Sequence, residues 1–248
     1  LRRLARGELF ALMSCGMAGI AGTVMVLYAS LVGRVIPNAL GNILIAAVIS
    51  TPAALAIAAL MVPFRPDPSA AVALALDDPP ASAMDAIAKG TRDGVVFLLH
   101  IAAMLIVAIA LVSLVNAALA LLPDLAGAPV TLQRLFAYAF RPIMWLIGIP
   151  GRETATAAAL MSTKTVLNEF VAYVDLARLP PGALDARSRL IMTYALCGFA
   201  NFGSLGILIG GMGAMVPERR AEIVALGLRS ILSGTFATCM SGAVVGML

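Results

Sequence analysis

Residues 190–216 read LIMTYALCGFANFGSLGILIGGMGAMV, a run of 27 residues without a charge. About 20 apolar residues are enough to cross a bilayer as a helix. The middle of this run, residues 198–206, holds three glycines, an asparagine and a serine, which weaken a helix and bring polar groups to mid-membrane depth. Irregular backbone is tolerated there only where it is buried in protein or lines a cavity, and secondary transporters build their sites from such broken helices. The stretch therefore predicts a membrane-spanning helix that is interrupted at a solute site.

The composition of the whole chain also predicts a membrane protein. Hydrophobic residues make up 61% of the sequence and charged residues 12%, and the mean hydropathy is +1.00. Four more uncharged runs are long enough to span, at 9–32, 39–63, 95–122 and 230–248. We expect an all-α polytopic protein of the cell (inner) membrane. Its net charge of +4 fits arginines in cytoplasmic loops rather than a nucleic-acid surface.

The order of apolar and polar segments divides the chain into five parts. Residues 1–63 hold a span with a weak middle and the span that follows it. Residues 64–94 form a polar loop with an interfacial helix, residues 95–122 a scaffold span, and residues 123–150 a connector with a second interfacial helix. Residues 151–248 hold a hairpin at 154–175, then the broken span and the last span. The hairpin is too short for two crossings, so we expect it to be re-entrant.

Two weak spans share a short sequence match. Residues 15–22, CGMAGIAG, align with residues 197–204, CGFANFGS, with three of eight positions identical. Each match lies in a span broken near its middle, and the expected elements between them give the two spans opposite directions. This arrangement predicts an inverted repeat, which is typical of secondary transporters.

Several motifs then resemble one family. They are TKTVLNEFVAY at 163–173, FANFGSLG at 199–206, PERR at 217–220, FRPIMWLIG at 140–148 and MAGIAGTV at 17–24. Together they resemble the concentrative nucleoside transporter family, and the resemblance extends over essentially the whole chain. It implies an ion-coupled carrier that brings nucleosides into the cell by alternating access. It further implies a homotrimer in which each protomer moves a transport domain against a scaffold, with no cofactor besides the co-transported Na⁺ or H⁺.

The resemblance also implies the substrate-binding residues. The residue that matches the family's hairpin glutamate is Glu169, which would bind the ribose hydroxyls. Asn201 and Ser204 match the asparagine and serine that complete the ribose site, with the aromatic ring of Phe199 nearby. The side chain of Val24 matches a valine that packs on the base. A carboxylate suits a ribose chemically, because it accepts hydrogen bonds from two neighbouring hydroxyl groups.

Two departures from the family limit these implications. Sodium-coupled members carry a small hydroxyl residue where this chain has Gly19, next to Ile20, so the coupling cation is left open between sodium and a proton. The family's first hairpin, which reads the base, would lie upstream of Leu1. Since the chain opens on this leucine rather than on methionine, we expect an upstream part that is missing here, and the accepted bases cannot be read from this sequence.

Other functions fit the sequence less well. An intramembrane enzyme would need a nucleophile with a base or a set of metal ligands, and the sequence holds no HExxH, no GxSxG and no carboxylate pair within a span. The alternative that stays open is a non-transporting membrane subunit or a truncated remnant of such a carrier. For Glu169 the competing interpretation is an internal pair with Lys164, and for Asn201 and Ser204 it is packing between helices.

Overall fold

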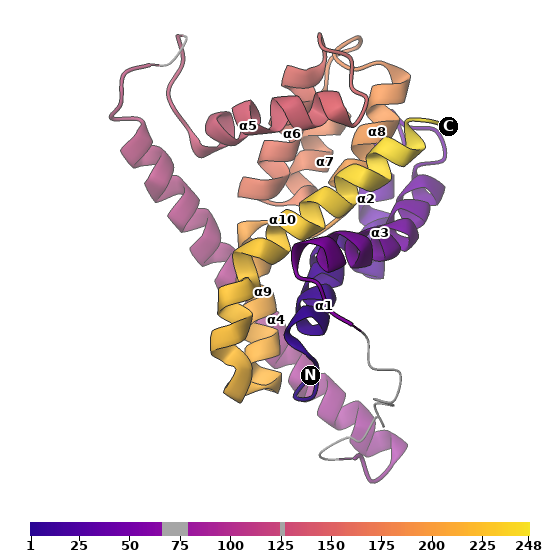
Figure 1. Ribbon diagram of the computed structural model, residues 1–248, viewed down its shortest axis with the longest axis vertical. Helices are drawn as coiled ribbons and strands as arrows, with labels where there is room; N and C mark the ends of the chain where they lie inside the picture. The colour runs from indigo at the N-terminus through magenta and orange to yellow at the C-terminus, as the bar shows by residue number, and fades with distance from the viewer. Residues whose placement is uncertain (66–78, 125–126) are drawn as a thin grey trace.

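A computed structural model describes residues 1–65, 79–124 and 127–248 of the chain, and within these ranges the fold is helical. Figure 1 shows the arrangement of the helices. In chain order they are α1 (Arg6–Ala18), α2 (Gly22–Val32), α3 (Ala39–Met61), α4 (Ala83–Leu119), α5 (Leu132–Leu146), α6 (Thr154–Val166), α7 (Glu169–Arg178), α8 (Ala186–Leu196), α9 (Phe202–Met215), the 3₁₀ turn η1 (Pro217–Arg219) and α10 (Arg220–Val245).

The predicted membrane spans correspond to long apolar helical stretches. Among the described residues, four stretches are long and apolar enough to cross a bilayer: Arg6–Val32, Ala39–Met61, Ala102–Leu119 and Pro217–Val245. The helix Phe202–Met215 is apolar but shorter. The expectation of an all-helical protein with several membrane-spanning segments is confirmed.

Both predicted helix breaks are present. The chain leaves helical geometry between α1 and α2, at residues 19–21, and between α8 and α9, at residues 197–201. The second break is shorter than the sequence suggested, because Gly203, Ser204 and Gly206 already lie in α9. The eight-residue match also does not align the two helix starts. It pairs Gly19 with Asn201, whereas the N-cap of α2 is Ala21 and that of α9 is Asn201.

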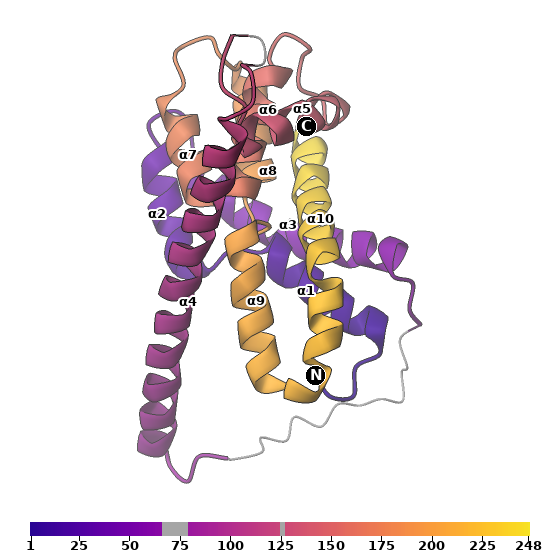
Figure 2. The same cartoon turned by 90° about the vertical axis from the view of Figure 1, so that its left-hand side faces the viewer.

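The expected boundary at residue 94 is not a helix end. Instead of an interfacial helix followed by a separate span, α4 runs without interruption from Ala83 to Leu119. Its N-cap is Ser82, whose hydroxyl accepts a hydrogen bond from the backbone N–H of Asp85 at 3.2 Å. The loop predicted before it lies partly at residues 66–78, outside the described residues. In Figure 2, α4 extends along the left-hand side of the molecule and reaches past the other helices.

The second predicted interfacial helix is α5, which lies near one end of the molecule beside α6 (Figure 2). It is amphipathic: Phe140 and Met144 are buried, whereas Tyr138 and Trp145 are exposed. Aromatic and arginine side chains on one exposed face are typical of a helix at the membrane–water boundary.

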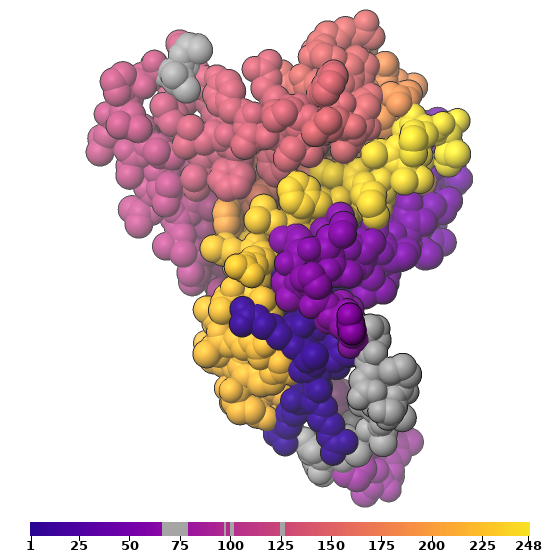
Figure 3. Space-filling view, viewed as in Figure 1, coloured from indigo at the N-terminus to yellow at the C-terminus, as the bar shows by residue number. Residues whose placement is uncertain are grey.

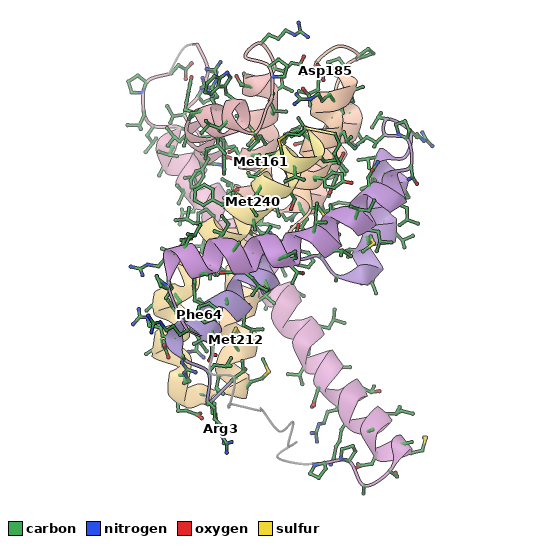
Figure 4. All side chains as sticks on the ribbon, turned by 45° about the vertical axis from the view of Figure 1, so that its right-hand side comes forward. Arg3, Phe64, Met161, Asp185, Met212 and Met240 are labelled. Atoms are coloured by element: carbon green, nitrogen blue, oxygen red, sulfur yellow. The ribbon has the colours of Figure 1, made fainter. Side chains whose placement is uncertain are left out.

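The two larger apolar clusters of the described residues lie on either side of the helix breaks. One is built from α2, α3 and α5–α8, with Tyr173 at 0% exposure. The other joins α1, α9 and α10 through Phe10 and Met212. Figure 4 shows Phe64 and Met212 at the end that holds Arg3, opposite the end that holds Asp185. In Figure 3, α10 runs across the face of the molecule, between α5–α8 and α1–α3.

Candidate functional site

The two helix breaks touch each other at the centre of the fold. The backbone N–H of Phe199 donates a hydrogen bond to the carbonyl oxygen of Gly19, with 3.1 Å between nitrogen and oxygen. This close approach needs a glycine at position 198, because a Cβ atom there would lie 2.8 Å from the carbonyl oxygen of Ala18. The crossing therefore brings the start of α9 next to the start of α2.

The helices α9 and α7 begin with side-chain caps, whereas the N-cap of α2 is Ala21, which makes no side-chain cap hydrogen bond. Asn201 Oδ1 accepts a hydrogen bond from the backbone N–H of Ser204 at 2.7 Å, and Asn168 Oδ1 accepts one from Val171 at 3.0 Å. Asparagine is among the preferred N-cap residues, since its side-chain oxygen satisfies a backbone N–H that has no partner within the helix. Each cap fixes the position of its helix start and of the residue beside it.

Glu169 is the buried acid at the centre of this arrangement. It is the first residue of α7 and is only 4% exposed. Its Oε1 accepts a hydrogen bond from the hydroxyl of Tyr28 at 2.7 Å, and its Oε2 accepts one from Nδ2 of Asn201 at 3.1 Å. The N-terminal end of a helix also favours negative charge. Three distant parts of the chain, α2, α7 and the N-cap of α9, thus hold one carboxylate.

A cavity of about 580 Å³ opens beside this carboxylate. All five predicted substrate-binding residues line it: Val24, Glu169, Phe199, Asn201 and Ser204. The remaining lining residues, mostly apolar, are Gly16, Met17, Ala21, Leu27, Tyr28, Leu105, Asn168, Phe170, Ile207 and Leu208. An apolar cavity with a few convergent polar groups is the usual form of a small-molecule site.

The predicted ion residues lie next to this cavity rather than in its wall. Gly19 and Ile20 belong to the break between α1 and α2 and are not among the lining residues. Gly19 instead contacts the other break through its carbonyl oxygen.

Sequence reasoning missed Tyr28, which contacts Glu169 directly. A signal for it exists in the sequence. Tyr28 is the only aromatic residue of α2 and lies four positions after Val24, so the two side chains share one face of the helix. Its exposed fraction is 2%, and a buried tyrosine hydroxyl needs a hydrogen-bond partner.

Comparisons with known proteins agree on one family. Residues 42–246 match the family described as "Na+ dependent nucleoside transporter C-terminus". The chain is 36% identical over 260 residues to an "Uncharacterized transporter" of Haemophilus influenzae, covering all of this chain and 60% of that protein. It is 32% identical over 252 residues to "Nucleoside permease NupC" of Helicobacter pylori, covering all of this chain and 59% of the permease.

Solved structures show the same fold. A structure of CNTnw in an inward-facing substrate-bound state superposes with a TM-score of 0.78 at 33% identity, covering 99% of this chain and 58% of that one. The chain therefore spans about 60% of the length of the bacterial relatives that it matches.

Proposed function

The chain belongs to the concentrative nucleoside transporter family, as a C-terminal part, and from this premise we propose that it supplies the ribose-binding side of an ion-coupled nucleoside symporter. The protein is a transporter-family member and not an enzyme. The chain covers about 60% of the length of its bacterial relatives. We therefore propose, for the whole protein, the uptake of nucleosides, the coupling to a cation and the assembly into an oligomer.

The observation that carries the proposal is the placement of Glu169. Its carboxylate faces a cavity about 580 Å³ in volume and is held from both sides by Tyr28 and Asn201. Each carboxylate oxygen has two lone pairs, so one remains on each oxygen for a solute. Two neighbouring sugar hydroxyls are the matching donors, and Ser204 adds a hydroxyl on the same wall. The apolar wall formed by Val24 and Phe199 suits the base.

The helix breaks support a mechanism of alternating access. We place a transport domain at the crossing of the breaks, with α6 and α7 as a re-entrant hairpin and the two broken helices as inverted repeats. This domain would slide against a scaffold that contains α4, within a homotrimer. The cation, sodium or a proton, would bind near Gly19 and Ile20, because the carbonyl-rich end of a broken helix attracts cations. Cation and nucleoside would then increase each other's affinity reciprocally.

Uridine uptake by the full-length gene product tests the proposal. We expect the parent protein to concentrate labelled uridine under a sodium or proton gradient, and Glu169→Gln to abolish uptake while the protein stays folded. The matched control is Glu218→Gln, which makes the same change at an exposed residue that pairs with Arg2 at 2.7 Å. Folding of each variant is followed by its melting temperature in detergent.

Two results would contradict the proposal. If the folded parent moves no nucleoside under either gradient, the protein is a non-transporting subunit or remnant. If Glu169→Gln transports as the parent does, the carboxylate is structural and the ribose site lies elsewhere.

A further inference from the structure

A second cavity, on the exposed side of α5, has no part in the proposed solute site. It measures about 180 Å³ and is lined by Arg134, Ala137, Tyr138, Arg141 and Ala155. The first four residues belong to α5, and Ala155 lies in the first turn of α6. The larger cavity beside the buried carboxylate is lined by other residues. The two cavities therefore belong to different sites.

The side chains of α5 divide between a buried face and an exposed stripe. Phe140 and Met144 are buried and pack with α6–α8. The exposed stripe alternates cations with aromatic rings, at positions i, i+4, i+7 and i+11 of the helix, which share one face: Arg134, Tyr138, Arg141 and Trp145. The packing of the buried face thus fixes the direction in which the stripe points, and the small cavity lies along this stripe.

The two arginines bring positive charge to the cavity. Arg134 is held in place, because its Nη1 donates to the carbonyl oxygens of Ala128 and Pro129. Both partners are neutral, so these two bonds position the guanidinium group without cancelling its charge. Within the part of the chain that the structure describes, Arg141 is exposed and makes no hydrogen bond or ion pair. The guanidinium group of Arg141 is therefore available to a ligand.

The elements packed against the cavity favour an anion as well. Ala155 lies at the N-terminal end of α6, where backbone N–H groups attract negative charge. The N-cap of α6 is the acid Glu153, which is 4% exposed and is not a lining residue. Its carboxylate accepts hydrogen bonds from the backbone N–H of Asp185 and from Nε of Arg152, both at 3.1 Å. The acid beside the cavity is thus already paired.

We propose that this cavity binds the phosphate group of an anionic phospholipid, with Arg134 and Arg141 as its cationic ligands. A guanidinium group forms paired, charge-assisted hydrogen bonds with phosphate oxygens. Leu135 and Leu146 are exposed and each follows a residue of the stripe, so they offer apolar surface to the acyl chains. The site would anchor α5 to one leaflet of the bilayer.

The surroundings of α5 favour a lipid over a free anion. Exposed arginine, tyrosine and tryptophan side chains on one face are typical of a helix at the membrane–water boundary. Figure 2 shows α5 near one end of the molecule, where such a boundary would lie. Basic side chains close to a membrane surface attract anionic lipids, which are concentrated there.

Lipid binding to the full-length gene product tests the proposal. The probes are phosphatidylglycerol, which is anionic, phosphatidylcholine, which has no net charge, and inorganic phosphate. Each is titrated into the protein in detergent while the melting temperature is recorded. We expect phosphatidylglycerol to raise the melting temperature in a saturable way, and the other two probes to have little effect. Arg141→Gln should bind phosphatidylglycerol about tenfold more weakly than the parent.

Two further variants separate the site from a general loss of charge. Arg178→Gln removes one exposed charge at the end of α7, beside a different cavity, and should keep the affinity of the parent. Arg141→Lys keeps the charge and loses the paired geometry, so it should bind more tightly than Arg141→Gln and more weakly than the parent. Because Arg141 has no partner among the described residues, we expect its variants to fold.

Three results would overturn the proposal. Equal shifts with phosphatidylglycerol and phosphatidylcholine would remove the need for an anionic ligand. An Arg141→Gln variant with the affinity of the parent would place the lipid elsewhere. A shift caused by inorganic phosphate alone, which Arg141→Gln abolishes, would replace the lipid by a free anion. These measurements do not use nucleoside uptake, so their failure would leave the proposed function intact.

Discussion

The ammonium group of Lys164 donates a hydrogen bond to the carbonyl oxygen of Ala195, with 2.9 Å between Nζ and oxygen. It donates a second one to Oγ1 of Thr238, also at 2.9 Å, and the lysine is fully buried. Ala195 lies in the last turn of α8, where the carbonyl groups lack partners within the helix. A lysine of α6 thus satisfies the end of α8 at the break and ties it to α10.

Replacing this lysine should destabilise the protein. Lys164→Met keeps a long side chain but leaves the Ala195 carbonyl without the lysine, which we expect to cost about 1–3 kcal/mol of unfolding free energy. The melting temperature in detergent measures the loss. Lys89→Met is the control, because its pair with Asp85 on α4 lies near the surface and is worth only about 0.3–0.5 kcal/mol. Equal losses in both variants would contradict a structural role for the buried ammonium group.

The crossing of the two breaks leads to a second prediction, at Gly198. A Cβ atom at this position would lie 2.8 Å from the carbonyl oxygen of Ala18 and 2.7 Å from Cγ2 of Thr238. The backbone at residue 198 cannot shift away without disturbing the hydrogen bond between Phe199 and Gly19. We therefore expect Gly198→Ala to lower the unfolding free energy by about 1–3 kcal/mol and to abolish uptake. Gly210→Ala, in open space within α9, should instead be neutral or stabilising by up to about 1 kcal/mol. A Gly198→Ala variant that melts and transports like the parent would refute this.

The broken helices were predictable because their signal is local. Glycine, asparagine and serine inside an uncharged run weaken the helix wherever the chain folds, and both breaks occur where such residues cluster. The polarity change at residue 94 does not coincide with a helix end. Residues 83–94 are polar and residues 95–119 are apolar, but a change of polarity does not end a helix that has no cap or proline at that point.

The residues of the candidate site could be singled out from the sequence where they interrupt the apolar pattern of a membrane span. Glu169 and Asn201 stand out because an acid and an amide are costly in an apolar segment without partners. The role of Tyr28 depends on a contact with a residue 141 positions away, and tyrosine is an ordinary residue in a span. Only the folded arrangement brings its hydroxyl to the carboxylate.

Asn201 has two tasks that substitution can separate. Its Oδ1 caps α9 through the N–H of Ser204, and its Nδ2 donates to Glu169. Asn201→Ser keeps a capping oxygen and loses the amide group that donates to Glu169, whereas Asn201→Ala loses both. We expect both variants to lose at least about tenfold in uridine affinity, and the alanine variant to be less stable than the serine variant by about 1 kcal/mol. Affinity and melting temperature are measured on the same samples. Normal affinity in Asn201→Ser would show that the amide donor is unimportant.

Stability should depend on pH through the cap of α8. The backbone N–H of Ser188 donates to Oδ1 of Asp185 at 2.7 Å, and this bond lowers the pKa of the Asp185 carboxyl. Because the folded-state pKa lies below the unfolded value, of about 3.9, the ionised cap stabilises the fold at neutral pH. This contribution is lost as the pH falls through the folded-state pKa.

The variant Asp185→Asn checks the sign of this effect. Asparagine also caps helices but does not titrate. We expect the melting temperature of the parent minus that of Asp185→Asn to be smaller at about pH 3 than at about pH 7. A difference that stays constant over this range would mean that the Asp185 carboxyl has the same pKa in the folded and unfolded states.

The coupling cation can be tested at Gly19. This residue is the C-cap of α1, and a Cβ atom there would meet only the carbonyl oxygen of Cys15, at 3.3 Å, so a serine fits with a small shift. The end of a broken helix carries partial negative charge and attracts cations, and a hydroxyl would add one more oxygen ligand. We expect Gly19→Ser to increase the stimulation of uridine uptake by sodium at a fixed proton gradient. Gly19→Ala adds the same carbon without the oxygen and should leave the sodium response of the parent unchanged. Equal sodium responses in the two variants would place the cation away from Gly19.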